Sequence, residues 1–160
     1  MVFPVGERRW WRVLFDFGEY GSFTGMLGLM YESLSPTIER SSIVRKVIAS
    51  LPFSSESMVF DGVELLIKLP PHFRQKIFKR DHVAKKGEIF YRPHIPAISI
   101  FADGYEVYEP IEKIGMVRKE DVDKFLDVVE KIKNLASVYV EIRKHEPRKE
   151  ETEEEEEEEE

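Results

Sequence analysis

The stretch that decides the fold lies in the middle of the chain and reads Gly87-Glu-Ile-Phe-Tyr-Arg-Pro-His-Ile-Pro-Ala-Ile-Ser-Ile-Phe101. Aromatic and β-branched residues fill both of its ends, at 88–91 and 95–101, which is typical of strands. Between them, Arg92-Pro93-His94 contains a proline, which favours a turn. The stretch therefore predicts two short neighbouring strands joined by a tight connection.

Upstream of this stretch, an N-terminal hairpin is expected. In residues 9–17, every second residue from Trp11 to Phe17 is apolar, as in a half-buried strand. Residues 22–31 resume an extended pattern after a glycine-flanked turn, and glycines 25 and 28 indicate bulges or close backbone approaches. The Trp10-Trp11 pair is either part of the core or an interface patch.

Further strands are expected on both sides of the central stretch. The apolar run 58–69 is broken at Asp61-Gly62 and ends at Pro70-Pro71. The basic stretch 72–86 shows no periodicity, whereas 105–117 and 137–143 are again extended in pattern.

Two amphipathic helices complete the pattern. Ser35 is a candidate N-cap with Pro36 at the first helical position, and Pro52 ends this helix. Residues 119–134 predict the second helix, with acidic residues near its start. About seven strands and two helices in this order predict a mainly β fold, a closed or nearly closed, mostly antiparallel barrel with helices packed on it.

The element order and several short motifs resemble the cyclophilin-like β-barrel family of small prokaryotic and archaeal proteins, whose activity is generally unassigned. The resemblance spans about 34–142. Its motifs are Leu51-Pro52-Phe53 after the first helix, Asp61-Gly62-Val63-Glu64 before an apolar strand, Gly87-Glu88-Ile-Phe-Tyr91-Arg92-Pro93 with Ala97-Ile-Ser-Ile-Phe101, and Ile114-Gly115. Asp61 stands where the family has tryptophan, and Arg92 stands where it has an aromatic residue, so a different ligand face is expected.

The resemblance implies a peptide or ligand groove. Cyclophilins isomerise X-Pro bonds by binding the twisted bond more tightly than the planar one, with an arginine in a Phe-His-Arg strand. The corresponding strand here, 60–67, contains no arginine or histidine, and Phe73-Arg74 lies in the basic stretch instead. We therefore expect a small-ligand or peptide-binding module without efficient prolyl isomerase chemistry and predict no catalytic residue, with a prolyl isomerase as the alternative.

The candidate ligand site combines a carboxylate, a guanidinium, an imidazole and two aromatic rings on neighbouring strands. Its predicted members are Glu64, Tyr91, Arg92, His94 and Phe101. Simpler interpretations stay open: Glu64 and Arg92 as a surface ion pair worth about 0–1 kcal/mol, Phe101 as core, and His94 as structural.

The charge of the chain is unevenly distributed. The net charge is −7, but residues 146–160 hold eleven of the 31 acidic residues and two of the 24 basic ones. Residues 1–145 are therefore slightly basic, at +2. We expect a barrel domain over 1–145, with an extended hairpin at 1–33, and a disordered Glu-rich tail at 146–160.

A single-stranded nucleic-acid-binding module regulated by the tail is a further alternative. The supporting residues form a basic patch near Phe73, Phe78 and Phe90, which would stack on bases. The patch comprises Arg74, Lys76, Lys79, Arg80, Lys85 and Lys86. Nucleic acid is nevertheless the less favoured partner, because the body is weakly basic and the glutamates would compete for the same lysines.

Several function classes are excluded or disfavoured. The absence of cysteine excludes disulfides, thiolate zinc sites and a cysteine nucleophile. The four histidines lack ligand spacing and no Gly-x-Ser-x-Gly motif occurs, so neither a metal, another cofactor nor serine catalysis is expected.

The sequence also bears on the surroundings of the protein. No apolar run approaches the roughly 20 residues of a membrane span, and the start lacks a signal-peptide core, which predicts a cytoplasmic protein with no membrane partner. One asparagine and one glutamine beside 34% charged residues favour a heat-adapted source.

Overall fold

The structure is a computed structural model that describes residues 10–28, 43–77 and 80–145. Nine strands, two α-helices and three 3₁₀ turns occur in this described part. In chain order they are β1 (Trp10–Asp16), η1 (Gly18–Tyr20), β2 (Ser22–Gly28), α2 (Ile43–Ser50), β3 (Phe53–Phe60), β4 (Glu64–Lys68), η2 (Pro71–Phe73), β5 (Asp81–Ala84), β6 (Glu88–Arg92), β7 (Ala97–Phe101), β8 (Tyr105–Val117), η3 (Lys119–Asp121), α3 (Val122–Ile132) and β9 (Val138–Lys144).

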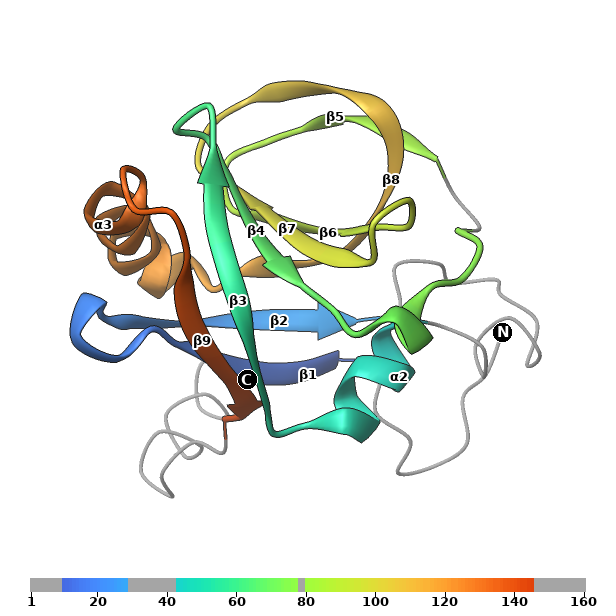
Figure 1. The fold of residues 1–160 in the computed structure, drawn as a ribbon, viewed down its shortest axis with the longest axis horizontal. Coiled ribbons are helices and arrows are strands. Elements are labelled where there is room, and N and C mark those ends of the chain that lie inside the picture. Colours follow the sequence, from blue (N-terminus) through green and yellow to red (C-terminus); the bar gives the residue numbers. More distant parts are fainter. Residues whose placement is uncertain (1–9, 29–42, 78–79, 146–160) are drawn as a thin grey trace, which may run out of the picture.

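Eight of these strands close into an antiparallel barrel (Figure 1). Their order is β2-β1-β9-β3-β4-β7-β6-β8, and an additional pairing of β2 with β8 closes the ring. The ninth strand, β5, lies outside the ring and pairs with β8. The prediction of a mainly β, mostly antiparallel closed barrel with two helices is confirmed.

Strand β5 was not expected, because the basic stretch 72–86 carries no period-two pattern. The strand has four residues, and its register against β8 is irregular between Asp81 and Val83. Backbone pairing with the long strand β8 holds it, so its side chains need not alternate between core and solvent. The estimate of about seven strands was therefore low.

The hairpin β3–β4 turns where the sequence indicated. Asp61 and Gly62 both have positive φ, at 53° and 68°, which is the backbone of a type I′ turn and explains the Asp-Gly pair. Strand β3 begins earlier than the apolar run, at Phe53, because its first residues pair with β9.

Gly115 allows the barrel to close. It pairs with Leu27 where β8 meets β2, and a Cβ at this position would collide with the carbonyl oxygen of Met26. The two backbones approach this closely only because residue 115 has no side chain.

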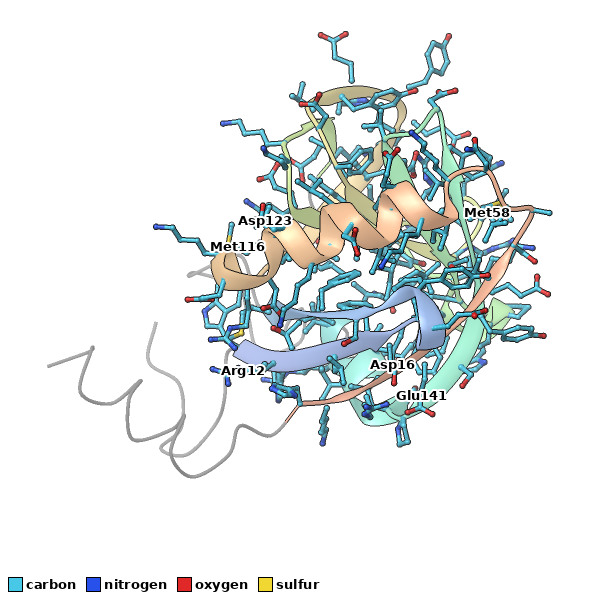
Figure 2. All side chains as sticks on the ribbon, turned by 90° about the vertical axis from the view of Figure 1, so that its left-hand side faces the viewer. Arg12, Asp16, Met58, Met116, Asp123 and Glu141 are labelled. Atoms are coloured by element: carbon cyan, nitrogen blue, oxygen red, sulfur yellow. The ribbon has the colours of Figure 1, made fainter. Side chains whose placement is uncertain are left out.

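Helix α3 lies across the β1–β2 hairpin (Figure 2). The carboxylate of Asp121, just before the helix, accepts hydrogen bonds of 2.7 Å from the backbone amide and the hydroxyl of Thr24 on β2. Asp16 and Glu141, near one another in Figure 2, are bridged by Arg143. The expected N-cap of the other helix, Ser35, lies outside the described residues. The C-terminal part of that expected helix is α2.

The buried apolar residues form two clusters. The larger one fills the barrel and its helical cover, whereas the smaller one comprises Ala84, Phe90, Phe101, Val107 and Ile111. The members of the smaller cluster come from β6 and β7, from the extra strand β5 and from β8. The N-terminal tryptophans belong to neither buried set: Trp10 is exposed, and Trp11 is half-buried below Arg45.

Within the described residues, none of the helices is long and apolar enough to cross a membrane.

Candidate functional site

The site is built on the adjacent strands β4, β7 and β6, whose two faces have different roles. Because side chains alternate along a strand, Leu65, Ile98 and Tyr91 point to the larger core, whereas their neighbours point to the other face. On that second face Glu64, Ser99 and Arg92 lie as diagonal neighbours, since Glu64 pairs with Phe101 and Arg92 with Ala97.

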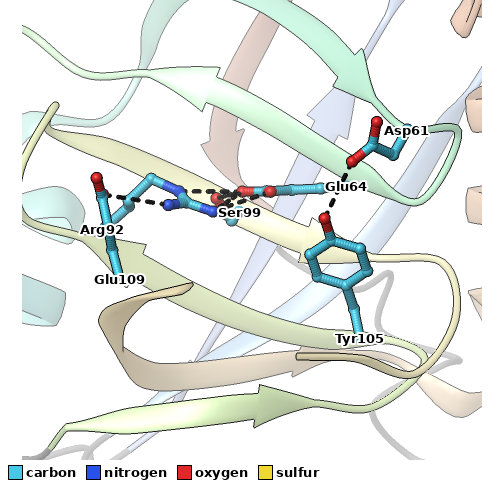
Figure 3. A network of polar contacts seen from close by, with 6 residues as sticks. All are labelled: Asp61, Glu64, Arg92, Ser99, Tyr105 and Glu109. Atoms are coloured by element: carbon cyan, nitrogen blue, oxygen red, sulfur yellow. Dashed lines mark hydrogen bonds and ion pairs between the residues drawn. The ribbon is translucent and has the colours of Figure 1, made fainter. Parts of the chain in front are cut away.

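Glu64 and Arg92 form a bidentate ion pair (Figure 3). The Arg92 guanidinium donates to the Glu64 carboxylate over 2.7 to 3.1 Å, and the Ser99 hydroxyl donates to the same carboxylate at 2.6 Å. The side chains of Arg92 and Glu64 are only 15% and 7% exposed. The interpretation as a surface ion pair is therefore wrong.

The burial of this pair changes its energetics. Desolvating both charges is costly, and the cost is offset because Ser99 and the two parallel N–H bonds satisfy the Glu64 oxygens. Removing one partner would leave an uncompensated buried charge. The pair thus holds the end of β6 in one geometry.

Two further contacts flank the pair in Figure 3. The Arg92 Nη1 atom lies 3.5 Å from Oε2 of Glu109 on β8, whose side chain is 45% exposed. The Tyr105 hydroxyl donates to Asp61 at 3.0 Å, and this hydrogen bond is the main cause that raises the pKa of Tyr105.

Tyr91 is fully buried and points to the other face of β6, into the larger core. Its hydroxyl donates to the carbonyl of Phe73 at 2.7 Å and accepts from the amide of Gln75 at 3.1 Å. Burial is the largest cause that raises the pKa of Tyr91, partly offset by the Gln75 hydrogen bond. Tyr91 therefore anchors the segment that carries Arg74.

A concavity of about 630 Å³, open to solvent, lies where this segment meets the β6–β7 turn and the middle of β8. It is lined by Arg74, Pro93, His94, Ile95, Glu109 and Pro110. Its volume is in the range of roughly 300–1,000 Å³ found for small-molecule sites. We refer to it below as the concavity.

The five predicted site residues do not share one surface. His94 lines the concavity, and Glu64 and Arg92 lie behind it, linked to it through Glu109. Tyr91 is buried in the larger core, and Phe101 is buried in the smaller one, edge-on to Phe90.

The pattern did not single out Ser99, Glu109 or Pro110. The only signal for the last two was a Glu-Pro pair inside an extended run.

The basic patch is exposed where it is described. Arg74, Lys76, Arg80, Lys85 and Lys86 are exposed, and Lys79 lies outside the described residues, as does Phe78. Phe73 and Phe90, however, are buried, so neither offers an open ring for stacking on a base. This weakens the nucleic-acid interpretation.

No cluster of three or more potential metal ligands occurs among residues 10–28, 43–77 and 80–145.

Comparisons with known proteins support the fold. A comparison with the models of known protein families finds no match, and no curated protein matches the sequence. Solved structures of similar fold include the following two.

The first is the solution structure of the hypothetical protein AF2241 from Archaeoglobus fulgidus, with a TM-score of 0.59 at 17% identity, covering 88% of this chain and 100% of that one. The second is McbB in complex with tryptophan, with a TM-score of 0.62 at 15% identity, covering 85% of this chain and 45% of McbB. At these identities the similarity shows a shared barrel fold. The chain spans less than half of McbB.

Proposed function

We propose that this barrel protein binds a small organic ligand or a short peptide at the concavity. The observation that carries the proposal is the placement of Arg74 and Glu109, one basic and one acidic, on one mostly apolar hollow. Its other lining residues are Pro93, His94, Ile95 and Pro110. Apolar hollows with a few convergent polar groups are the usual form of a ligand site.

Two further features support this function. The buried Glu64–Arg92–Ser99 network ties the strand that enters the β6–β7 turn to its neighbours, and a preorganised site loses less entropy on binding. Part of McbB has a similar fold, and McbB was solved in complex with tryptophan, which makes tryptophan a suitable first probe.

The binding test is an NMR titration of the labelled protein with tryptophan and with a proline-containing tetrapeptide. We expect the amides of His94 and Ile95 to shift in a saturable way, and Ile95→Asp to weaken binding because it removes apolar contact area. Tyr139→Asp, at an exposed tyrosine on β9, is the matched control. If neither probe moves the amides around the concavity, the proposal fails.

Prolyl isomerase activity is the second candidate, and the position of Arg74 favours testing it. Arg74 lies outside the strand where cyclophilins carry their arginine, yet its side chain lines the concavity. The same tetrapeptide in a cis/trans exchange assay separates the two functions. We expect no rate enhancement, whereas an enhancement abolished by Arg74→Ala would establish the isomerase.

Membership of the cyclophilin-like family and a cytoplasmic location are part of the same proposal. The eight-stranded antiparallel barrel with two helices supports the family assignment, and the cysteine-free sequence suits a reducing compartment.

A further inference from the structure

The concavity contains an uncompensated positive charge. Arg74 is exposed, and its guanidinium forms no ion pair within the part of the chain that the structure describes. Its backbone is held in place, because its amide donates to Pro71 and the segment is tied to Tyr91. An exposed cation without an ion-pair partner among the described residues, on a mostly apolar hollow, is suited to receive an anionic group of a ligand.

The opposite charge is present on the same lining. The positive charge of Arg92 is already balanced by its bidentate contact with Glu64. The contact of Glu109 with Arg92 therefore does not give Glu109 a cation of its own. The Arg92–Glu109 separation of 3.5 Å is longer than the Arg92–Glu64 contacts, and Glu109 remains 45% exposed. Glu109 therefore contributes a partly exposed acidic side chain to the concavity.

Apart from the His94 imidazole, the remaining lining is apolar. Pro93 and Pro110 have no side-chain polar atoms, and Ile95 is 60% exposed, which is unusual for isoleucine. Covering these three residues would remove apolar area from water and contribute to binding.

We propose that the ligand is a zwitterion of the amino-acid type with an apolar side chain. Its carboxylate pairs with Arg74, its ammonium group pairs with Glu109, and its side chain covers Ile95 and the two prolines. This inference rests on the proposed function, since it names the ligand class of the same concavity. Charge complementarity determines the choice: a purely anionic ligand would face Glu109, and a purely cationic one would face Arg74.

Four probes with the same phenyl group test the inference. Phenylalanine carries both charges, N-acetylphenylalanine only the carboxylate, phenylalaninamide only the ammonium group, and N-acetylphenylalaninamide neither. We expect phenylalanine to bind most tightly by NMR titration, with roughly three- to tenfold weaker binding for each charge removed. The difference should shrink between about 0.01 M and about 0.15 M salt, because the charges lie near solvent.

Two charge-removing variants assign each contact. Arg74→Gln should weaken the binding of phenylalanine and N-acetylphenylalanine by roughly three- to tenfold. It should leave the affinities of phenylalaninamide and N-acetylphenylalaninamide, which lack the carboxylate, unchanged. Glu109→Gln should weaken the binding of phenylalanine and phenylalaninamide and leave the affinity of N-acetylphenylalaninamide unchanged. Glu130→Gln and Lys144→Gln, at exposed positions on α3 and β9, are the matched controls and should change none of the four affinities.

The outcomes separate the inference from the proposed function. If all four probes shift the amides around the concavity with equal affinity, or if the variants act on the wrong members of the series, the zwitterion inference is overturned and the binding function stands. If neither these four probes nor the tryptophan and tetrapeptide titrations shift those amides, the binding function itself is wrong.

Discussion

At the scale of single residues, the alternation of side chains along a strand decides what each group can do. Tyr91 and Arg92 are sequence neighbours but point to opposite faces of β6, one into the larger core and the other toward Glu64. Their roles differ accordingly: Tyr91 anchors the Arg74 segment from inside, and Arg92 links β6 to β4 and β8.

Glu64→Gln tests the buried ion pair. The change keeps the shape of the side chain and leaves Arg92 with Glu109, at 3.5 Å, as its carboxylate partner. Because this partner remains, we expect the free energy of unfolding to fall by about 2–3 kcal/mol, below the roughly 3–5 kcal/mol typical of fully buried pairs. Glu56→Gln removes the same charge from an exposed pair with Lys68 and should cost less than about 1 kcal/mol. Equal losses in urea denaturation would contradict a special role for the buried pair.

Tyr91→Phe tests the anchor through pH. Burial raises the pKa of Tyr91 above 10.0, its ordinary value, so ionisation is disfavoured in the folded state. Its contribution to stability is fully present below pH 10.0 and is lost as the pH rises through the folded-state pKa. The stability difference between wild type and Tyr91→Phe, measured by thermal unfolding, should therefore shrink as the pH rises above 10.0. A difference that does not vary with pH would argue against the anchor.

At the scale of elements, the closure of the barrel depends on one contact between distant strands. Strands β2 and β8 meet over three paired residues, and Gly115 forms the end pair with Leu27, where an added Cβ would collide with the Met26 backbone. The extra strand β5 pairs with the N-terminal half of β8, and both strands contribute residues to the smaller core.

Gly115→Ala should open this closure. The added methyl group meets the Met26 backbone, which cannot move without breaking the ladder, so we expect a loss of about 1–3 kcal/mol. Gly104→Ala is the control, since the nearest atom to its added carbon is 3.9 Å away. Hydrogen exchange of the amides paired between β2 and β8 reports the opening directly, and unchanged protection in Gly115→Ala would refute the explanation.

At the scale of the whole molecule, charge and fold are separable. Near the C-terminal end of the described residues, the His145 amide donates a hydrogen bond to the Arg12 carbonyl, and the fifteen residues that follow in the sequence carry the acidic excess. The domain boundary at 145 remains a prediction, as do the disorder of residues 146–160 and the heat-adapted source.

Deletion of residues 146–160 tests that boundary. The net charge should change from −7 to +2, because eleven acidic and two basic residues are removed. The melting temperature at physiological salt should stay within about 2 °C of the full chain, since 1 kcal/mol corresponds to roughly 2–4 °C at this size. A larger fall in calorimetry would show that the barrel depends on the tail.

Some of the architecture follows from the sequence by itself. Period-two runs, the Asp61-Gly62 turn and two amphipathic patterns are local signals, and they predicted most strands, both helices and a closed antiparallel barrel. Strand β5 had no such signal, because its pairing with β8 is a backbone interaction between segments that the periodicity of 72–86 does not reflect.

The site was decided by the tertiary structure. The sequence named Glu64, Arg92 and His94, but only the strand register brings Glu64 and Arg92 onto one face with Ser99 and buries Tyr91 and Phe101 in separate cores. Likewise, Arg74 and Glu109 lie on one concavity because three distant segments meet there. Local patterns determine which residues can form strands, whereas the charges that face one another depend on contacts between segments far apart in the chain.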